Sequence, residues 1–157
     1  MKNDFSELSY EERNVGVSLA EQKTDDFLKS KNIFYFEFGF ENQNLEKDHW
    51  FIVPRFFRNA PDRIVIHKKK FVLLEIKGCR EELKIKRLDF ESYIKWGKYA
   101  DFLFSIYSNS TKDIYIVPLG RIVKEETSAP EGSYPDNNEK YFKINIDRLE
   151  KYKRSLT

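Results

Sequence analysis

The stretch PDRIVIHKKKFVLLEIKG, residues 61–78, decides how the rest of the chain is interpreted. Two apolar runs rich in β-branched residues flank a short basic turn, which predicts a β-hairpin. If the turn is symmetric, Ile64 faces Leu73 and Asp62 faces Glu75. Side chains alternate between the two faces of a strand, so Asp62, Glu75 and Lys77 then lie on one face, at the open end of the hairpin. A slip of one residue would move Asp62 to the opposite face.

Two opposed carboxylates at the end of an apolar hairpin need compensation. A buried charge is costly unless it is paired or binds a metal, and like charges across a strand pair repel. A divalent cation between Asp62 and Glu75 would relieve both costs, and hard oxygen ligands suit Mg²⁺ or Mn²⁺. In the alternative interpretation, Lys77 neutralises the pair and the cluster is only structural. The residues alone leave both possibilities open.

Length and composition restrict the class of protein. The 157 residues, 40% of them apolar, predict a single domain over residues 1–157 with a real core. The chain has 28 basic and 26 acidic residues, so its net charge neither favours nor excludes a nucleic-acid partner. Cys79 is the only cysteine, which excludes an internal disulfide and a cysteine-based zinc cluster. No run approaches the roughly 18 apolar residues of a membrane span, and the N-terminus does not resemble a signal peptide. We therefore expect a cytoplasmic protein with no membrane contact.

The N-terminal segment predicts a long helix. Ser9-Tyr10-Glu11-Glu12 has the form of a capping box, so we expect a helix from near Tyr10 to about Ser30, interrupted around Gly16. Its apolar stripe is formed by residues at helical spacing, namely Val17, Ala20, Thr24, Phe27 and Leu28. Glu21 lies at the border of this stripe. Its carboxylate either points into the fold or lies at the boundary with solvent, as is ordinary for a glutamate.

Two aromatic stretches separate this helix from the hairpin. Residues 33–40 predict a strand with both faces partly covered. Residues 49–57 contain Pro54, which favours an edge strand or a bend. Arg55 and Arg58 bracket two phenylalanines there, and they either meet a phosphate backbone or are simply solvated.

Beyond the hairpin, residues 79–87 are a charged segment. Asp89 is a candidate N-cap for a helix over residues 90–99, whose end carries Lys95 and Lys98. Both lysines suit the helix dipole and are candidate phosphate contacts. Residues 101–107 and 113–117 predict two strands, and residues 125–140 a long surface loop. A last strand over 141–146 and a short helix capped by Asp147 complete the chain.

The order helix, strand, strand–turn–strand, helix, strand, strand, combined with Pro61-Asp62 and Glu75-Ile76-Lys77, resembles the PD-(D/E)XK nuclease superfamily. This superfamily includes restriction endonucleases and archaeal Holliday-junction resolvases. The resemblance spans residues 17–117. It implies an α/β fold of order α-β-β-β-α-β-β, with a restriction-endonuclease-like core in which helices flank a central mixed β-sheet. That core is expected over about 17–123, with the C-terminal strand and helix over about 141–153.

The same resemblance implies roles for individual residues. Asp62, Glu75 and the Ile76 carbonyl would bind Mg²⁺ or Mn²⁺, and Lys77 would orient the attacking water and stabilise negative charge. Glu21 is the position that fits a further acidic ligand from the first helix, with Glu12 as the alternative. The resemblance implies a metal-dependent nuclease acting on nucleic acid, DNA by the family's prevalence, and a homodimer. A catalytically weak nucleic-acid-binding or structural subunit, and an RNA-directed nuclease, are the alternatives.

Overall fold

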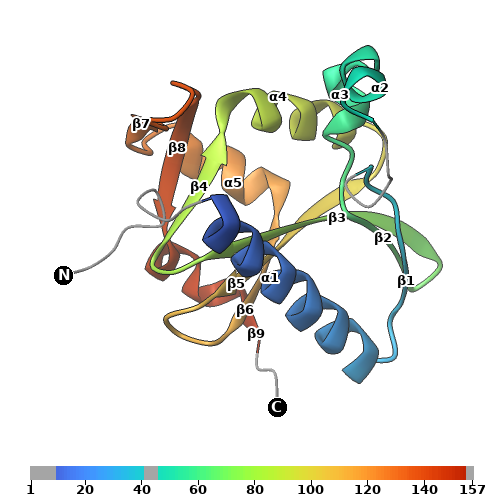
Figure 1. The fold of residues 1–157 in the computed structure, drawn as a ribbon. Coiled ribbons are helices and arrows are strands. Elements are labelled where there is room, and N and C mark those ends of the chain that lie inside the picture. Colours follow the sequence, from blue (N-terminus) through green and yellow to red (C-terminus); the bar gives the residue numbers. More distant parts are fainter. Residues whose placement is uncertain (1–9, 41–45, 155–157) are drawn as a thin grey trace.

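The computed structural model describes residues 10–40 and 46–154 (Figure 1). A six-stranded sheet has the order β1-β2-β3-β5-β6-β9, and a three-stranded sheet has the order β4-β8-β7. The larger sheet contains β1 (Phe34–Glu37), β2 (Arg63–His67), β3 (Lys70–Cys79), β5 (Asp101–Ser108), β6 (Ile114–Pro118) and β9 (Lys153–Arg154). The smaller sheet contains β4 (Glu82–Lys86), β7 (Glu131–Ser133) and β8 (Lys140–Asn145). The helices are α1 (Tyr10–Ser30), α2 (Lys47–Ile52), α3 (Arg55–Arg58), α4 (Arg87–Trp96), α5 (Leu119–Glu126) and the 3₁₀ helix η2 (Ile146–Tyr152).

The β2–β3 hairpin has the register that a symmetric turn predicts. Ile64 pairs with Leu73, and Ile66 pairs with Phe71. The turn residues Lys68 and Lys69 have φ values of 49° and 64°. Left-handed conformations at both central residues are typical of type I′ turns, whose twist matches that of the strands. On its other side β3 pairs in parallel with β5, while the remaining ladders of this sheet are antiparallel. The sheet is therefore mixed, as expected.

Helix α1 covers one face of the larger sheet (Figure 1). Four residues of the expected stripe are buried, namely Ala20, Thr24, Phe27 and Leu28. They pack on a sheet face that includes Val65, Leu74 and Ile76. The helix is continuous through Gly16, so the expected interruption is absent. At this point the helix crosses the sheet closely: a Cβ on Gly78 would lie 3.1 Å from the Gly16 carbonyl oxygen. Ser9 and the side chains of Glu12 and Val17 lie outside the described part.

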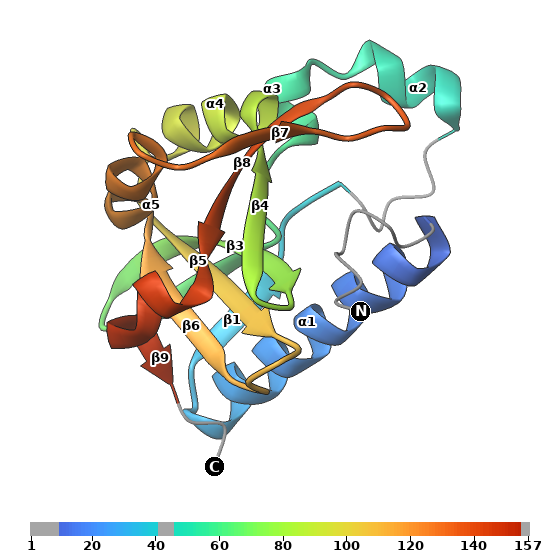
Figure 2. The same cartoon turned by 90° about the vertical axis from the view of Figure 1, so that its left-hand side faces the viewer.

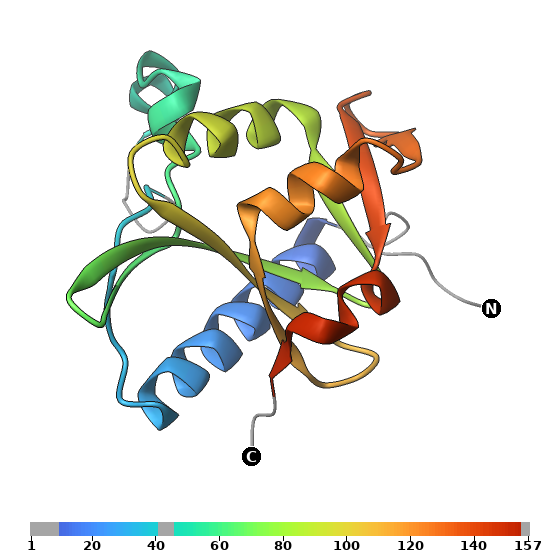
Figure 3. The same ribbon diagram turned by 180° about the vertical axis from the view of Figure 1, so that it is seen from behind.

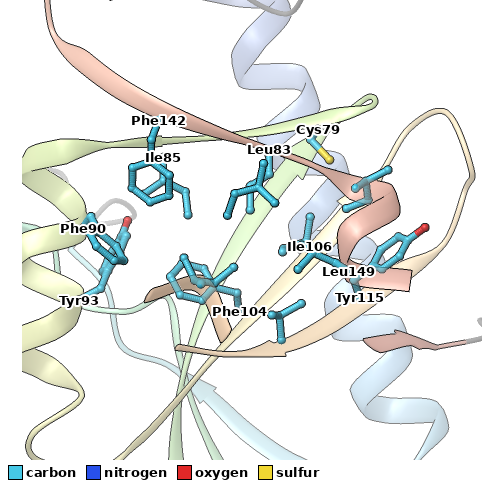
Figure 4. Close-up of a cluster of buried hydrophobic side chains, with 14 of the residues drawn as sticks. Cys79, Leu83, Ile85, Phe90, Tyr93, Phe104, Ile106, Tyr115, Phe142 and Leu149 are labelled. Atoms are coloured by element: carbon cyan, nitrogen blue, oxygen red, sulfur yellow. The ribbon is translucent and has the colours of Figure 1, made fainter. Parts of the chain in front are cut away.

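The opposite face of the larger sheet is covered by α4, α5 and the smaller sheet (Figures 2 and 3). Figure 4 shows the core between them, in which side chains from β4, α4 and β8 meet those of β5 and β6. Phe104 is fully buried at its centre, where it contacts Tyr93 edge to face with ring centroids 5.5 Å apart. This core fixes α4 above the strand that carries Glu75.

Three segments differ from expectation. Residues 49–57 do not form an edge strand, because α2 and α3 occupy most of the range; the alternative of a bend agrees with the structure, in which the chain bends at Val53 before Pro54, the N-cap residue of α3. The fixed φ of proline suits a helix start. The charged segment 79–87 contains β4, in which Leu83 and Ile85 are buried and alternate with polar residues. The segment 125–140 is not simply a loop, because α5 extends to Glu126 and β7 pairs with β8. Strand β4 depends on β8, which lies far away in the sequence, whereas β7 and β8 are consecutive strands of a local hairpin.

Two expected helix caps are also wrong by position. Helix α4 begins at Arg87, so Asp89 is in its first turn, and Lys86 is the N-cap residue. At η2 the N-cap is Asn145, whose side chain accepts a hydrogen bond from the Asp147 backbone N–H at 2.9 Å. No helix in the described part is long and apolar enough to cross a membrane.

Candidate active site

Asp62 is positioned at the point where β2 stops pairing with β3. The last ladder pair is Arg63 with Leu74, so the Ile76 amide lies beyond the end of the ladder. The Asp62 side chain replaces the missing backbone partner there, because its Oδ2 accepts a hydrogen bond from the Ile76 N–H at 2.7 Å. On the other side, the Asp62 carbonyl accepts from the Phe38 N–H at 3.0 Å. These contacts hold the Asp62 carboxylate beside the Glu75–Ile76 peptide.

Glu75 is a buried carboxylate, only 5% exposed, in the middle of β3. Its Oε1 atom accepts a hydrogen bond from the Tyr93 hydroxyl at 2.7 Å and lies 2.7 Å from Lys77 Nζ. A buried charge is tolerated when charged and hydrogen-bonding partners compensate it, and both are present here. The structure therefore brings Asp62, Glu75 and Lys77 together, and in this arrangement Lys77 neutralises Glu75.

Lys77 is held in its protonated form. Burial acts to lower the pKa of the Lys77 ammonium, but Glu75, with smaller contributions from Tyr93, Asp89 and Asp62, outweighs it and holds the pKa well above its usual value. The side chain is 26% exposed, so it is accessible from solvent. Near neutral pH, Lys77 is thus a cation and hydrogen-bond donor, and not a general base.

Helix α4 contributes two residues that the sequence did not single out as functional. Tyr93 is 2% exposed, and its pKa is raised by burial and by the neighbouring Glu75 charge. Asp89 lies one turn earlier on the same side of the helix and accepts a hydrogen bond from Asn59 Nδ2 at 3.0 Å. Its charge acts on both Lys77 and Tyr93. The spacing of four residues between an acidic residue and a tyrosine is the signal that could have identified them.

Glu21 lies close enough to Arg63 for its charge to act on the Arg63 guanidinium, as does the charge of Asp62. Arg63 is 3% exposed and makes an ion pair with Asp25 of α1, with Nε 3.2 Å from Oδ1. Burial acts to lower the pKa of Arg63, but the hydrogen bond and charge of Asp25, with the charges of Glu21 and Asp62, raise it overall. Within residues 10–40 and 46–154, no three His, Cys, Asp or Glu side chains are grouped so as to hold a metal. A role for Glu21 as a metal ligand stays a prediction.

The donor atoms around Asp62 fit magnesium chemistry. Mg²⁺ is usually held by one or two carboxylates, together with waters and substrate phosphates, and does not need a full protein cage. Asp62 and Glu75 supply two carboxylates, and the Asp62 hydrogen bond to the Ile76 amide brings one of them to the peptide next to the other. Zn²⁺ in structural sites prefers four cysteine or histidine ligands, and this pair does not provide them.

The candidate nucleic-acid contacts are on α3 and around the end of α4, and they are not part of this cluster. The Arg58 guanidinium lies 5.8 Å from the centroid of the Trp50 ring and 5.9 Å from that of Phe51. Arg55 is exposed at the start of α3, as are Lys95 and Lys98 near the end of α4. Lys95 follows Tyr93 by two residues, and because a helix turns about 100° per residue, it lies on nearly the opposite side of α4.

Comparisons with known proteins support the fold. No family model and no curated protein matches the sequence. Among solved structures, a Holliday junction resolvase from the archaeal hyperthermophile Archaeoglobus fulgidus superposes with a TM-score of 0.52 at 13% identity, over 85% of this chain and 87% of that one. A nuclease from a fusselovirus superposes with a TM-score of 0.49 at 10% identity, over 95% of this chain and 89% of that one. The resolvase match confirms, at the level of the fold, the resemblance to restriction-endonuclease-like nucleases.

Proposed function

We propose that this protein is a metal-dependent nuclease that hydrolyses phosphodiester bonds, most readily in DNA. The observation that supports it is the convergence of Asp62, Glu75 and Lys77 on one face of a mixed sheet with a nuclease fold. Two carboxylates and an ammonium group that are partly or fully buried together lower the stability of the fold, because each loses hydration. They suit a reaction in which negative charge develops on a phosphate oxygen.

Each residue of the cluster has a separate proposed role. Asp62, Glu75 and the Ile76 carbonyl would hold Mg²⁺ or Mn²⁺, which when bound supplies charge stabilisation and acidifies a water. Glu21 is proposed as a weaker, additional ligand. Lys77 Nζ, protonated at neutral pH, would donate to the attacking water and to an oxygen of the scissile phosphate.

Tyr93 has a positioning role in this proposal. Its hydroxyl donates to the same Glu75 oxygen that Lys77 approaches. If Lys77 turns towards a phosphate, Tyr93 keeps the Glu75 carboxylate oriented. The Lys77 ammonium group would therefore be able to leave Glu75 while the Glu75 carboxylate keeps its position.

The test uses isosteric variants that keep side-chain volume. Asp62→Asn and Glu75→Gln should each reduce cleavage by at least about a hundredfold, since metal ions contribute several kcal/mol to such reactions. Glu91→Gln, on the exposed side of α4, is the matched control and should cleave like wild type. Cleavage is measured with Mg²⁺ and with Mn²⁺ on single-stranded, duplex and branched DNA and on RNA. Full activity in both Asp62→Asn and Glu75→Gln would exclude this site.

One observation favours the alternative of a catalytically weak nucleic-acid-binding subunit. Glu75 Oε1 already has two partners, so a metal must compete with Lys77 for it. Calorimetry with Mn²⁺ on wild type and Glu75→Gln separates the two candidates. Metal binding that is lost in Glu75→Gln, without cleavage of any substrate in the panel, would favour the subunit. Cleavage confined to RNA would favour an RNA-directed nuclease.

A further inference from the structure

The sheet face that carries Glu75 and Lys77 continues towards the hairpin turn as an apolar surface. Two rows of paired residues cross β1, β2 and β3 there: Phe34–Ile66–Phe71 and Phe36–Ile64–Leu73. In the first row Phe34 is 65% exposed and Phe71 51%, and in the second Phe36 is 45% exposed. We call Phe34, Phe36, Phe38 and Phe71 the ring strip. Singly exposed apolar residues are ordinary, but neighbouring rings on one face indicate a binding surface.

The ring strip begins at the candidate active site. The Phe38 N–H donates to the Asp62 carbonyl, so Phe38, directly after the end of β1, is the neighbour of Asp62. The Phe38 ring is 36% exposed and contacts Trp96 of α4 edge to face, with centroids 5.7 Å apart. Helix α4 also carries Tyr93, so both contacts lie on the catalytic face. From Phe38 the rings of Phe36 and Phe34 follow, the latter two with centroids 6.3 Å apart.

The other end of the ring strip is positively charged. Lys68, Lys69 and Lys70 form the exposed tip of the hairpin, directly beyond the row that contains Phe71. The strand between Asp62 and this tip spans about 17 Å at roughly 3.3 Å per residue. The two rows between these ends contain no charged side chain. The surface thus has acidic residues for catalysis at one end, rings in the middle and cations at the other end.

These features match one kind of ligand. A nucleic-acid strand with unpaired bases offers phosphates to lysines and flat aromatic faces to rings, whereas a duplex hides its base faces by stacking. We propose that the ring strip binds unpaired bases of the nucleic acid next to the cleavage site, while the lysine tip contacts its phosphates. This inference rests on the proposed nuclease function, and it defines the substrate as one with a single-stranded or unpaired segment.

The test compares binding with and without the rings. Phe34→Leu/Phe36→Leu keeps an apolar strand surface but removes both rings, and Phe34→Trp/Phe36→Trp keeps aromatic faces. Binding of a labelled oligodeoxythymidine and of a duplex of equal length is measured by fluorescence anisotropy without added metal, so that cleavage does not intervene. Val123→Ala, which removes part of an exposed apolar side chain on α5, is the off-strip control. Thermal unfolding verifies that each variant is folded, and Phe71→Leu serves as a second variant if the leucine pair is not.

We expect the leucine pair to weaken single-strand binding by about fivefold or more per ring, because stacking of one base on an aromatic ring contributes roughly 1–3 kcal/mol. Duplex binding should stay unchanged, and the tryptophan pair should bind like wild type with quenched fluorescence. Unchanged single-strand binding in the leucine pair would overturn the inference. So would a shift from dimer to monomer on sedimentation with unchanged affinity, because the ring strip would then be an interface between two copies.

The outcome also separates this inference from the proposed function. Wild-type protein that cleaves duplex DNA but has no affinity for single strands contradicts the ring strip alone. Wild-type protein that binds and cleaves no nucleic acid contradicts both.

Discussion

At the residue scale, the candidate site depends on how Glu75 divides one carboxylate oxygen between two donors. The Lys77 ammonium and the Tyr93 hydroxyl both lie 2.7 Å from Oε1. The lysine supplies charge compensation and the tyrosine supplies orientation. Because the two donors have different roles, their removal should have different consequences.

Removing the tyrosine hydroxyl should separate orientation from charge. Tyr93→Phe should lower the free energy of unfolding by about 1.5–3 kcal/mol, the usual contribution of a hydrogen bond to a charged group. It should also reduce cleavage, because the hydrogen bond from the Tyr93 hydroxyl then no longer orients the Glu75 carboxylate. Urea unfolding and cleavage rates measure the two effects. Tyr99→Phe, 73% exposed at the end of α4, is the control and should change neither. Wild-type cleavage by Tyr93→Phe would rule out the positioning role.

The same groups predict how stability depends on pH. The pKa values of Lys77 and Tyr93 are both raised in the folded state, the first mainly by Glu75 against the opposing effect of burial, the second by burial and Glu75. A raised pKa contributes stability that is complete below the unfolded value, about 10 for tyrosine and about 10.4 for lysine, and is lost as the pH rises through the folded value. Stability from this cluster should therefore be constant from neutral pH to about 10 and then fall.

Urea unfolding at a series of pH values between about 8 and 11 measures this dependence. The Glu75→Gln/Lys77→Met double variant, combined with Tyr93→Phe, should lose less stability above pH ~10 than wild type does, because its cluster no longer titrates there. An equally steep fall in the variant would assign the alkaline transition to other groups.

At the scale of elements, the site depends on the contact between α1 and β3. Gly78 follows Lys77 directly, and a Cβ at this position would lie 3.1 Å from the Gly16 carbonyl oxygen and 3.5 Å from the Ala20 Cβ. One of these neighbours is helix backbone, which cannot rotate away. The helix and the strand can therefore approach each other closely only because this position has no side chain.

Gly78→Ala should destabilise the protein by about 1–3 kcal/mol, the typical cost of overpacking a close contact. Gly120→Ala is the matched control, because a Cβ there meets nothing within 4 Å and alanine favours the α5 helix. That variant should be as stable as wild type or more stable. Thermal or urea unfolding compares the two. Equal stability of Gly78→Ala and wild type would show that α1 can shift without cost.

Secondary structure was predictable wherever one element shows its own pattern. Helix α1, the β2–β3 hairpin and strands β5 and β6 were all expected from local periodicity or turn chemistry. Strand β4 was not, because its alternation of two apolar residues with charged ones gains meaning only when β8 pairs with it. Strand β7 pairs with β8 in a local hairpin, but it has only three residues, Glu131–Ser133, and no apolar alternation. Local propensity therefore could not identify either strand.

At the scale of the whole molecule, charge is nearly balanced, with a formal net charge of +2. A long-range attraction for nucleic acid is therefore weak, and affinity must come from local groups. In addition to Lys77 and the lysine tip of the hairpin, Arg55, Arg58, Lys95 and Lys98 are proposed to contact phosphates. They come from two neighbouring helices, α3 and α4, that pack together above the larger sheet (Figure 1).

This arrangement predicts a shallow salt dependence of duplex binding. If these four residues each neutralise one phosphate, together they should contribute about −3.6 to the slope of log Kobs against log salt concentration, at roughly −0.9 per contact. Lys95→Met should reduce the slope by about 0.9, whereas Lys151→Met, on η2, should leave it unchanged. Anisotropy titrations at several salt concentrations measure both. A slope that Lys95→Met does not change would exclude Lys95 as a phosphate contact.

By itself, the sequence predicted the hairpin, the register that a symmetric turn gives it, and the placement of Asp62, Glu75 and Lys77 on one face of the sheet. A symmetric turn and a period of two residues are local properties, and they leave little freedom to the chain. Only the tertiary structure decided what meets that face. Tyr93 and Asp89 reach Glu75 and Lys77 because the core fixes α4 above β3, and Phe38 adjoins Asp62 because β1 pairs with β2. Such contacts join residues far apart in the sequence, so they depend on packing of the whole chain and leave no local pattern.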